Sequence, residues 1–189
     1  MSNLAGTLFG LLLGVQCLTE LHGVFILFTN VTCESKDLSI SVVEYCEVTS
    51  LGKTKNSVRL RYTMPKPVFK NIGFHFQLMT KGSESINGVS NWQPFLYGMN
   101  LDMCRFWKNR HNYLAKMVFE LIEGHSNLNH SCPYSNEKFI AIDGITNTDI
   151  SSKIRGIPLT KGSYALFTKW STENITRVLT KFYFDVLSV

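Results

Sequence analysis

The feature that most restricts the fold of this chain is an alternation of apolar and polar residues with a period of two. In the stretch SVRLRYTM, residues 57–64, every second residue from Val58 to Met64 is apolar, and the residues between them are polar. Neighbouring side chains of a β-strand point to opposite faces, so this pattern is typical of a strand with one buried face. The stretch NIGFHFQLMT, residues 71–80, repeats it.

Three further stretches alternate in the same way: residues 37–48, 163–170 and 175–189. The four residues STEN separate the last two stretches, which predicts a β-hairpin at the end of the chain. Pro65 and Pro67 lack the backbone N–H that a sheet requires, so they mark the end of the strand at residues 57–64. We therefore predict an all-β protein, built as an antiparallel, immunoglobulin-like β-sandwich or cup.

One segment departs from this period. In HNYLAKMVFELIEGH, residues 111–125, apolar residues recur at helical spacing, and five of them share one side: Leu114, Met117, Val118, Leu121 and Ile122. Asn112 is a suitable N-cap, and Gly124 can end a helix in the left-handed conformation. We predict one short helix here, bracketed by Cys104 and Cys132 and packed at the edge of the sandwich.

The first residues of the chain indicate export. Residues 1–18 contain no charged side chain and include an apolar run from Leu8 to Leu13. A run this short is typical of a secretory signal peptide rather than a membrane span. We predict a signal peptide at residues 1–23, a single domain at residues 24–189, and an extracellular, secreted protein. Because apolar residues resume at residues 24–28, an uncleaved anchor is the alternative.

Export determines how the cysteines are interpreted. Cys17 would leave with the signal peptide, and the remaining four predict two disulfides in an oxidising compartment. Three pairings are open, and we favour Cys33–Cys46 and Cys104–Cys132 because the partners of each pair are close in sequence. Three Asn-x-Ser/Thr triplets fit the same compartment and predict N-linked glycans on Asn30, Asn129 and Asn174.

The stretch SNLNHSCPY, residues 126–134, places a histidine near a cysteine and raises the alternative of a metal or catalytic site. The chain has no nucleophile elbow, zinc-protease motif or phosphate-binding loop to accompany it. We therefore interpret this stretch as a structural corner anchored by Cys132, and we predict no enzyme activity, no catalytic residue, no metal and no cofactor. Lysine and arginine are scattered despite a net charge of +5, which argues against a nucleic-acid partner.

Several blocks of the sequence resemble a known family. They are FTNVTCES at residues 28–35, PFLYGMNLDMCRFWKNR at 94–110, HSNLNHSCPY at 125–134, and the proline, glycine and tyrosine of residues 157–164. In order and spacing they resemble a family of secreted insect proteins, described as a domain of unknown function, that includes the CheB chemosensory proteins. The resemblance implies the β-sandwich or cup of the ganglioside activator and MD-2-related lipid-recognition proteins. It also implies binding of a lipid or a hydrocarbon-like chemical cue, but no catalytic residue.

The aromatic content leaves two hypotheses for the function. Thirteen phenylalanines, seven tyrosines and three tryptophans either fill a sandwich core or line a cavity. The leading hypothesis is a carrier that presents a hydrophobic small molecule or lipid, with six candidate lining residues: Phe74, Phe76, Leu78, Phe167, Phe182 and Phe184. The alternative is an interaction module with a packed core, which contacts a membrane receptor through Trp92 or Tyr97. A cavity below about 300 Å³ would favour the alternative. The sequence indicates no oligomeric state.

Overall fold

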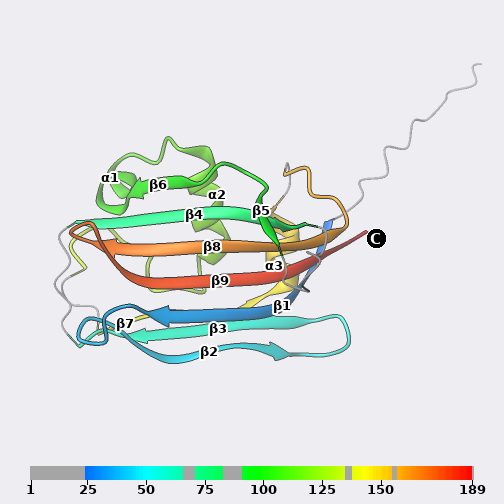
Figure 1. Ribbon diagram of the computed structural model, residues 1–189, viewed down its shortest axis with the longest axis horizontal. Helices are drawn as coiled ribbons and strands as arrows, with labels where there is room; N and C mark the ends of the chain where they lie inside the picture. The colour runs from blue at the N-terminus through cyan, green and yellow to red at the C-terminus, as the bar shows by residue number, and fades with distance from the viewer. Residues whose placement is uncertain (1–23, 66–70, 83–90, 135–137, 155–156, 189) are drawn as a thin grey trace, which may run out of the picture.

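The computed structural model describes residues 24–65, 71–82, 91–134, 138–154 and 157–188, and the predicted signal peptide lies outside them. The strands form two antiparallel sheets, and β2 and β3 of one lie next to the β1 edge of the other in Figure 1. The larger has the strand order β1-β9-β8-β4-β5, with β6 also paired to β4, and the smaller has the order β2-β3-β7. The bounds are β1 Val24–Ser35, β2 Val42–Ser50, β3 Asn56–Thr63, β4 Ile72–Lys81, β5 Trp92–Pro94, β6 Met99–Asp102, β7 Phe139–Thr146, β8 Gly162–Thr172 and β9 Ile175–Ser188. The predicted all-β sandwich is confirmed.

The strands with the clearest alternation form where the sequence predicts them. In β3, Val58, Leu60 and Tyr62 are almost fully buried, because they form the inner face of the smaller sheet. The predicted terminal hairpin is β8 and β9. Its turn is shorter than expected, with only Glu173 and Asn174 between the strands, and both have positive φ (52° and 64°). Two such residues give a turn whose twist matches the twist of the paired strands.

The strand predicted at residues 37–48 is wrong in its first part, because β2 begins only at Val42. The side chain of Asp37 accepts hydrogen bonds from the backbone N–H and the hydroxyl of Ser39. The backbone carbonyl of Asp37 accepts from the N–H groups of Ile40 and Ser41. An aspartate that binds its own backbone in this way forms a turn. Leu38 is consequently 70% exposed instead of lying on a buried face.

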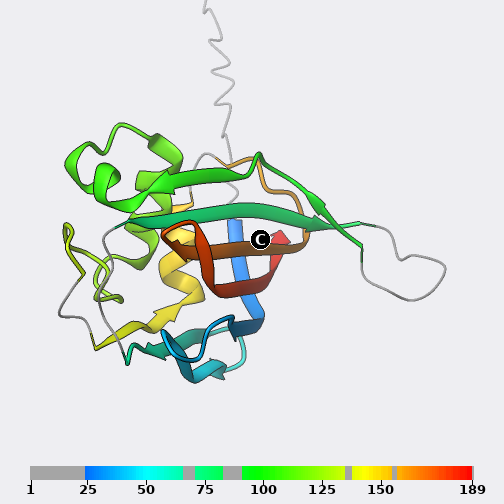
Figure 2. The same ribbon diagram turned by 60° about the vertical axis from the view of Figure 1, so that its left-hand side comes forward.

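The predicted helix is α2, Tyr113–Ile122. As expected, the side chain of Asn112 accepts a hydrogen bond from the N–H of Ala115 at 3.0 Å, and Gly124 has a φ of +82° just after the helix. Two further helices, α1 Met103–Lys108 and α3 Asn147–Lys153, were not predicted. Both are short, and each begins directly after a strand. In Figure 2, α3 lies between the two sheets, on the inner side of the larger one.

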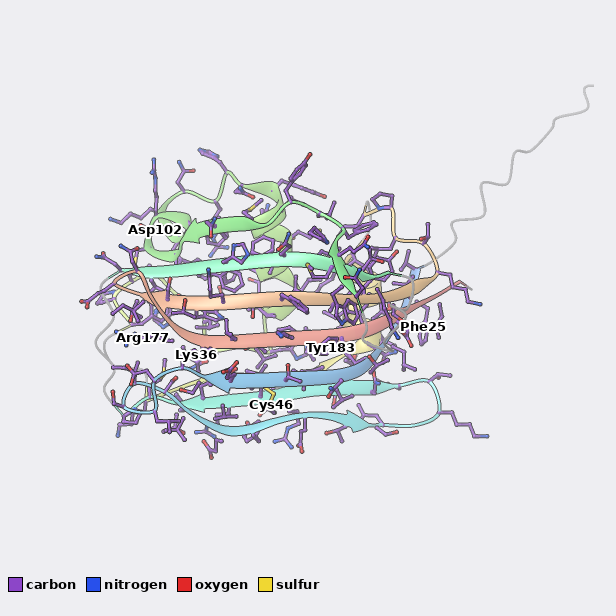
Figure 3. The ribbon with its side chains drawn as sticks, viewed as in Figure 1. Phe25, Lys36, Cys46, Asp102, Arg177 and Tyr183 are labelled. Atoms are coloured by element: carbon purple, nitrogen blue, oxygen red, sulfur yellow. A yellow bond between two sulfur atoms is a disulfide. The ribbon has the colours of Figure 1, made fainter. Side chains whose placement is uncertain are left out.

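Both predicted disulfides are present. They link the two sheets at opposite edges of the sandwich. Cys33–Cys46 connects β1 to β2, which are edge strands of the larger and the smaller sheet (Figure 3). Cys104–Cys132 connects α1, which follows edge strand β6, to the segment 126–134. That segment is attached to β7, the other edge of the smaller sheet, by a bridge between Ser126 and Ile142.

Two buried asparagines hold one end of the sandwich together. Asn147, at the start of α3, is fully buried. Its side chain donates to the carbonyls of Ile26 (2.9 Å) and Thr54 (3.0 Å) and accepts from the backbone N–H of Asn56 (2.9 Å). The side chain of Asn56 in turn donates to the carbonyl of Phe28. Backbone groups of β1, of β3 and of the turn before β3 are thereby satisfied by two amides, as buried polar groups require.

Within the described residues, no helix is long and apolar enough to cross a membrane. The apolar residues 24–28, which left an uncleaved anchor open in the sequence, form the first part of β1.

Candidate functional site

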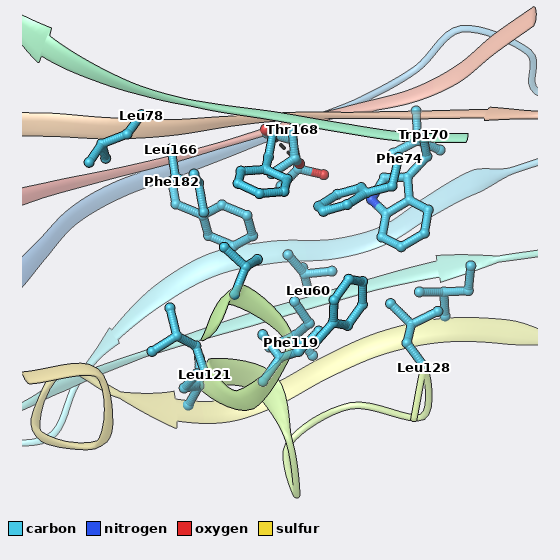
Figure 4. Close-up of a pocket in the computed structure, with 18 of the residues that line it drawn as sticks. Leu60, Phe74, Leu78, Phe119, Leu121, Leu128, Leu166, Thr168, Trp170 and Phe182 are labelled. Atoms are coloured by element: carbon cyan, nitrogen blue, oxygen red, sulfur yellow. Dashed lines mark hydrogen bonds between the residues drawn. The ribbon is translucent and has the colours of Figure 1, made fainter. Parts of the chain in front are cut away.

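An apolar cavity of about 200 Å³ lies between the two sheets and the helices. The inner face of the larger sheet forms one wall, and the inner faces of β3 and β7 form another. Helix α2 lies opposite β4 and β8 and closes the space between these walls (Figure 4). The five apolar residues predicted to share one side of this helix all line the cavity.

The cavity is elongated along the strands. On β9 its lining residues run from Arg177 to Phe184, which corresponds to about 23 Å of extended chain. On β8 they run from Leu166 to Thr172. A volume of about 200 Å³ within so long a lining suits a thin chain better than a globular ligand.

The structure places five of the six predicted lining residues at this cavity: Phe74, Phe76, Leu78, Phe182 and Phe184. The prediction that Phe167 lines the cavity is wrong. Its ring lies 6.2 Å from those of Trp92 and Tyr183, on the outer face of the larger sheet. Leu166 and Thr168 line the cavity, so the residue between them must point outward. The stretch SYALFTKW has apolar residues at both odd and even positions, and the alternation therefore did not reveal which set faces inward.

The sequence reasoning missed the contribution of the helical segment to this site. Phe119 of α2 contacts Phe74 of β4 with ring centroids 5.7 Å apart, and Trp170 of β8 contacts the same ring at 4.4 Å. Phe119 also packs on Phe106 of α1 at 4.9 Å. This aromatic cluster fixes α2 against the larger sheet. The helical periodicity placed Phe119 next to the apolar stripe, and this was the available signal.

The hydroxyl groups in the middle of the cavity are paired with protein atoms. The Tyr62 hydroxyl lies 2.7 Å from that of Thr180, and the Thr168 hydroxyl donates to the carbonyl of Thr180 at 3.0 Å. A hydroxyl that is already bonded offers little to a ligand, and a polar guest group would lose its own hydrogen bonds to water without replacement. This part of the cavity is suited to an apolar guest.

Burial of Tyr62 leads to a prediction about alkaline stability. Loss of water raises the pKa of its hydroxyl from 10.0 to about 12, although the hydrogen bond with Thr180 acts in the opposite direction. The folded protein therefore holds this proton more tightly than the unfolded chain does. The resulting contribution to the free energy of unfolding is complete below pH 10 and is lost as the pH rises toward 12. We expect the free energy of unfolding of Tyr62→Phe to fall less steeply over this window, by roughly 2–3 kcal/mol, in urea titrations. Parallel slopes for both proteins would contradict this.

An ion pair lies at one end of the cavity. Among the described residues that line the cavity, Arg177 is the one charged side chain. It binds the carboxylate of Asp37 and donates to the hydroxyl of Thr172 at 2.9 Å. The pKa of Asp37 is lowered, mainly by the hydrogen bond from Ser39 and further by Arg177, with burial opposing both. The turn that contains Asp37 also contributes Ile40 to the lining.

The opposite end reaches the surface. Leu96 and Tyr97, between β5 and β6, line it together with Ile157 and Leu159, which precede β8. Tyr97 is 96% exposed, so this part of the lining borders solvent. Trp92, the other predicted receptor contact, instead packs on Phe167 and Tyr183 and is half-buried.

The segment 126–134 has the contacts of a structural corner. The Tyr134 hydroxyl donates to the carbonyls of Leu128 (3.1 Å) and His130 (2.8 Å) and accepts from the indole N–H of Trp107 at 2.8 Å. The His130 ring packs on Tyr134, and the Cys132–Pro133 peptide bond is cis. These contacts attach the segment to α1 and to itself. The three predicted glycan acceptors, Asn30, Asn129 and Asn174, are all exposed, and their modification stays a prediction.

Comparison with known families gives a match for the middle of the chain, which forms part of this site. Residues 74–166, just under half of the chain, match a family model described as "Protein of unknown function (DUF1091)". This segment of the chain is therefore similar to that family. The match begins in β4, includes α1, α2 and α3, and ends at Leu166 in β8. The matched segment supplies α2, β7 and most of the inner face of β4, while the walls formed by β1, β3, β9 and most of β8 lie outside it. No curated protein matches the chain.

Proposed function

We propose that this protein is a secreted carrier that binds an apolar small molecule, such as a lipid chain or a hydrocarbon cue, in the cavity between its sheets. The observation that carries the proposal is the cavity itself, which is elongated, apolar and lined by both sheets and α2. Burial of each methylene of a guest is favourable by about 0.8 kcal/mol, so binding requires no charged anchor. The two disulfides and the DUF1091 match are compatible with this role and do not identify the guest.

The volume restricts the guest. About 200 Å³ is below the ~300 Å³ at which ligand pockets for drug-sized molecules begin. It exceeds the ~150 Å³ at which an engineered apolar cavity binds benzene. The proposal is therefore limited to a thin, flexible guest, of which a part lies in the cavity and the remainder extends past Tyr97 into solvent.

Uptake of n-octane and octanoic acid, measured separately as the increase in melting temperature, tests the proposal. A ligand that binds only the folded state raises this temperature. We expect octane to bind, and we expect Leu166→Trp, which fills the cavity, to weaken its binding at least tenfold. The extra volume also costs roughly 1–3 kcal/mol of stability. Leu187→Trp is the matched control, because Leu187 is 37% exposed at the end of β9.

Native mass spectrometry of the protein secreted from cells gives a second measurement. We expect a bound apolar compound in the wild-type protein and in Leu187→Trp, but not in Leu166→Trp. Equal octane binding by both tryptophan variants, or no binding by the wild-type protein, would disprove the carrier function.

The limited volume also favours a second candidate function. An interaction module that contacts a receptor needs no ligand pocket, and the described surface includes two large exposed aromatic side chains, Tyr97 (96%) and Tyr113 (71%). Exposed tyrosines are frequent in binding hot spots. If octane does not bind while Tyr97→Ala removes binding of the secreted protein to cells, this second function replaces the first.

A further inference from the structure

Three aromatic rings form a cluster on the outer face of the larger sheet, on the opposite side from the cavity. Trp92 of β5 lies 5.4 Å from Tyr183 of β9 and 6.2 Å from Phe167 of β8. All three side chains are half-buried, and the ammonium group of Lys181 lies 4.9 Å from the Phe167 ring. We call these three residues the outer ring cluster. A cluster of half-buried rings offers apolar surface that a partner can cover, because the ring faces gain from burial.

Asn30 is the direct neighbour of this cluster across the strands. In the pairing of β1 with β9, Asn30 lies opposite Tyr183, whereas the next residue, Val31, is buried and lies opposite the cavity residue Phe182. Directly opposed residues of antiparallel strands project from the same face, with Cβ atoms about 4.5–5.5 Å apart. Asn30 follows a β-bulge between Phe28 and Asn30, and its amide oxygen accepts a hydrogen bond from the N–H of Val31 at 2.9 Å. Its exposed side chain therefore lies on the same face as Tyr183, which is labelled in Figure 3.

Asn30 also begins one of the three N-glycosylation triplets, Asn30-Val31-Thr32. We propose that an N-linked glycan on Asn30 packs on the outer ring cluster, so that its first N-acetylglucosamine covers the ring of Tyr183. The sugar has one face composed of C–H groups, which can stack on an aromatic ring, while its hydroxyl groups remain in water. The first sugar is bonded directly to the Asn30 amide, so it can reach a side chain whose Cβ atom lies about 4.5–5.5 Å away across the strands.

Neither of the other two triplets lies beside the outer ring cluster. Asn174 lies in the turn between β8 and β9 with a φ of 64°, beside the exposed Ile175. Asn129 lies in the corner formed by residues 126–134. The proposal is therefore specific to Asn30, and it assigns a covalently attached sugar, rather than a protein or a membrane, to this outer face.

A double-mutant cycle on protein produced in a glycosylating, secreting cell tests the proposal. Thr32→Val removes the acceptor triplet but keeps Asn30, and Tyr183→Thr removes the ring but keeps a residue suited to a strand. We expect Thr32→Val to lower the melting temperature by about 2–4 °C when Tyr183 is present, the size of one lost aromatic contact in a domain of this length. In the Tyr183→Thr background the same change should have an effect below about 1 °C.

Proton NMR of protein trimmed to single N-acetylglucosamine residues gives a signature that a general stability effect would not produce. We expect the ring protons of the sugar on Asn30 to shift upfield, and this shift to disappear in Tyr183→Thr. The sugar on Asn129 is the internal control, because its ring-proton shifts should not depend on Tyr183, and Asn129→Gln identifies its signals by removing them.

Three outcomes would overturn the proposal. One is glycopeptide mass spectrometry that finds Asn30 unmodified. Another is an effect of Thr32→Val that is the same with and without Tyr183. The third is binding of the fully glycosylated protein to phosphatidylcholine–phosphatidylserine vesicles that Tyr183→Thr removes, because the rings would then be open to lipid.

Discussion

Replacement of Asn147 by alanine is expected to destabilise the protein by roughly 3–5 kcal/mol. The fully buried side chain makes three hydrogen bonds, and its removal leaves the carbonyls of Ile26 and Thr54 and the N–H of Asn56 without this partner. Each buried group that loses its partner costs about 1–3 kcal/mol. For a domain of this length the loss corresponds to a fall in melting temperature of about 10 °C or more, measurable by calorimetry.

Asn71→Ala is the matched control for this experiment. Asn71 is exposed just before β4, so the same substitution there should change the free energy of unfolding by no more than about 0.5 kcal/mol. If Asn147→Ala cost less than about 1 kcal/mol in urea titrations, the two asparagines would not hold this end of the sandwich.

Phe119→Ala is expected to cost about 3–5 kcal/mol, the usual range for a buried phenylalanine. Its ring contacts Phe74, Phe106 and Trp107, so its loss removes the main attachment of α2 to the larger sheet and widens the cavity. Below its melting temperature the variant should therefore bind a wider guest, such as naphthalene, more tightly than the wild-type protein does. Chemical denaturation and thermal shift measure the two effects separately.

Tyr113→Ala on the same helix is the control, since Tyr113 is 71% exposed and its loss should change stability by no more than about 0.5 kcal/mol. Equal losses for Tyr113→Ala and Phe119→Ala would mean that helix propensity, rather than the aromatic cluster, determines how α2 is held.

The parts of the fold that could be predicted from sequence are those governed by local physical signals. Strand β3 followed from strict alternation, and the limits of α2 followed from Asn112 and Gly124, because caps act on the backbone next to them. The disulfide pairing followed from proximity in sequence. Strand β1 could not be recognised, because its first residues are apolar without alternation and continue the apolar residues of the predicted signal peptide.

The remaining features depend on contacts between distant residues. Asn147 is an ordinary polar residue in the sequence, and only the positions of β1 and β3 show that it satisfies their backbone. Phe167 was assigned to the cavity because apolar residues occur on both faces of β8. The outer face is apolar there because Trp92 of β5 covers it, and no signal within residues 163–170 indicates that cover.

The positions of the two disulfides have a consequence for how a guest would enter. Cys33–Cys46 and Cys104–Cys132 link the two sheets at opposite edges, so the sheets cannot separate at either edge. A guest would therefore enter the cavity at one of the two ends of the strands. Arg177, which binds Asp37, lines one of these ends, and the 96% exposed Tyr97 lines the other, so we expect a guest to enter beside Tyr97.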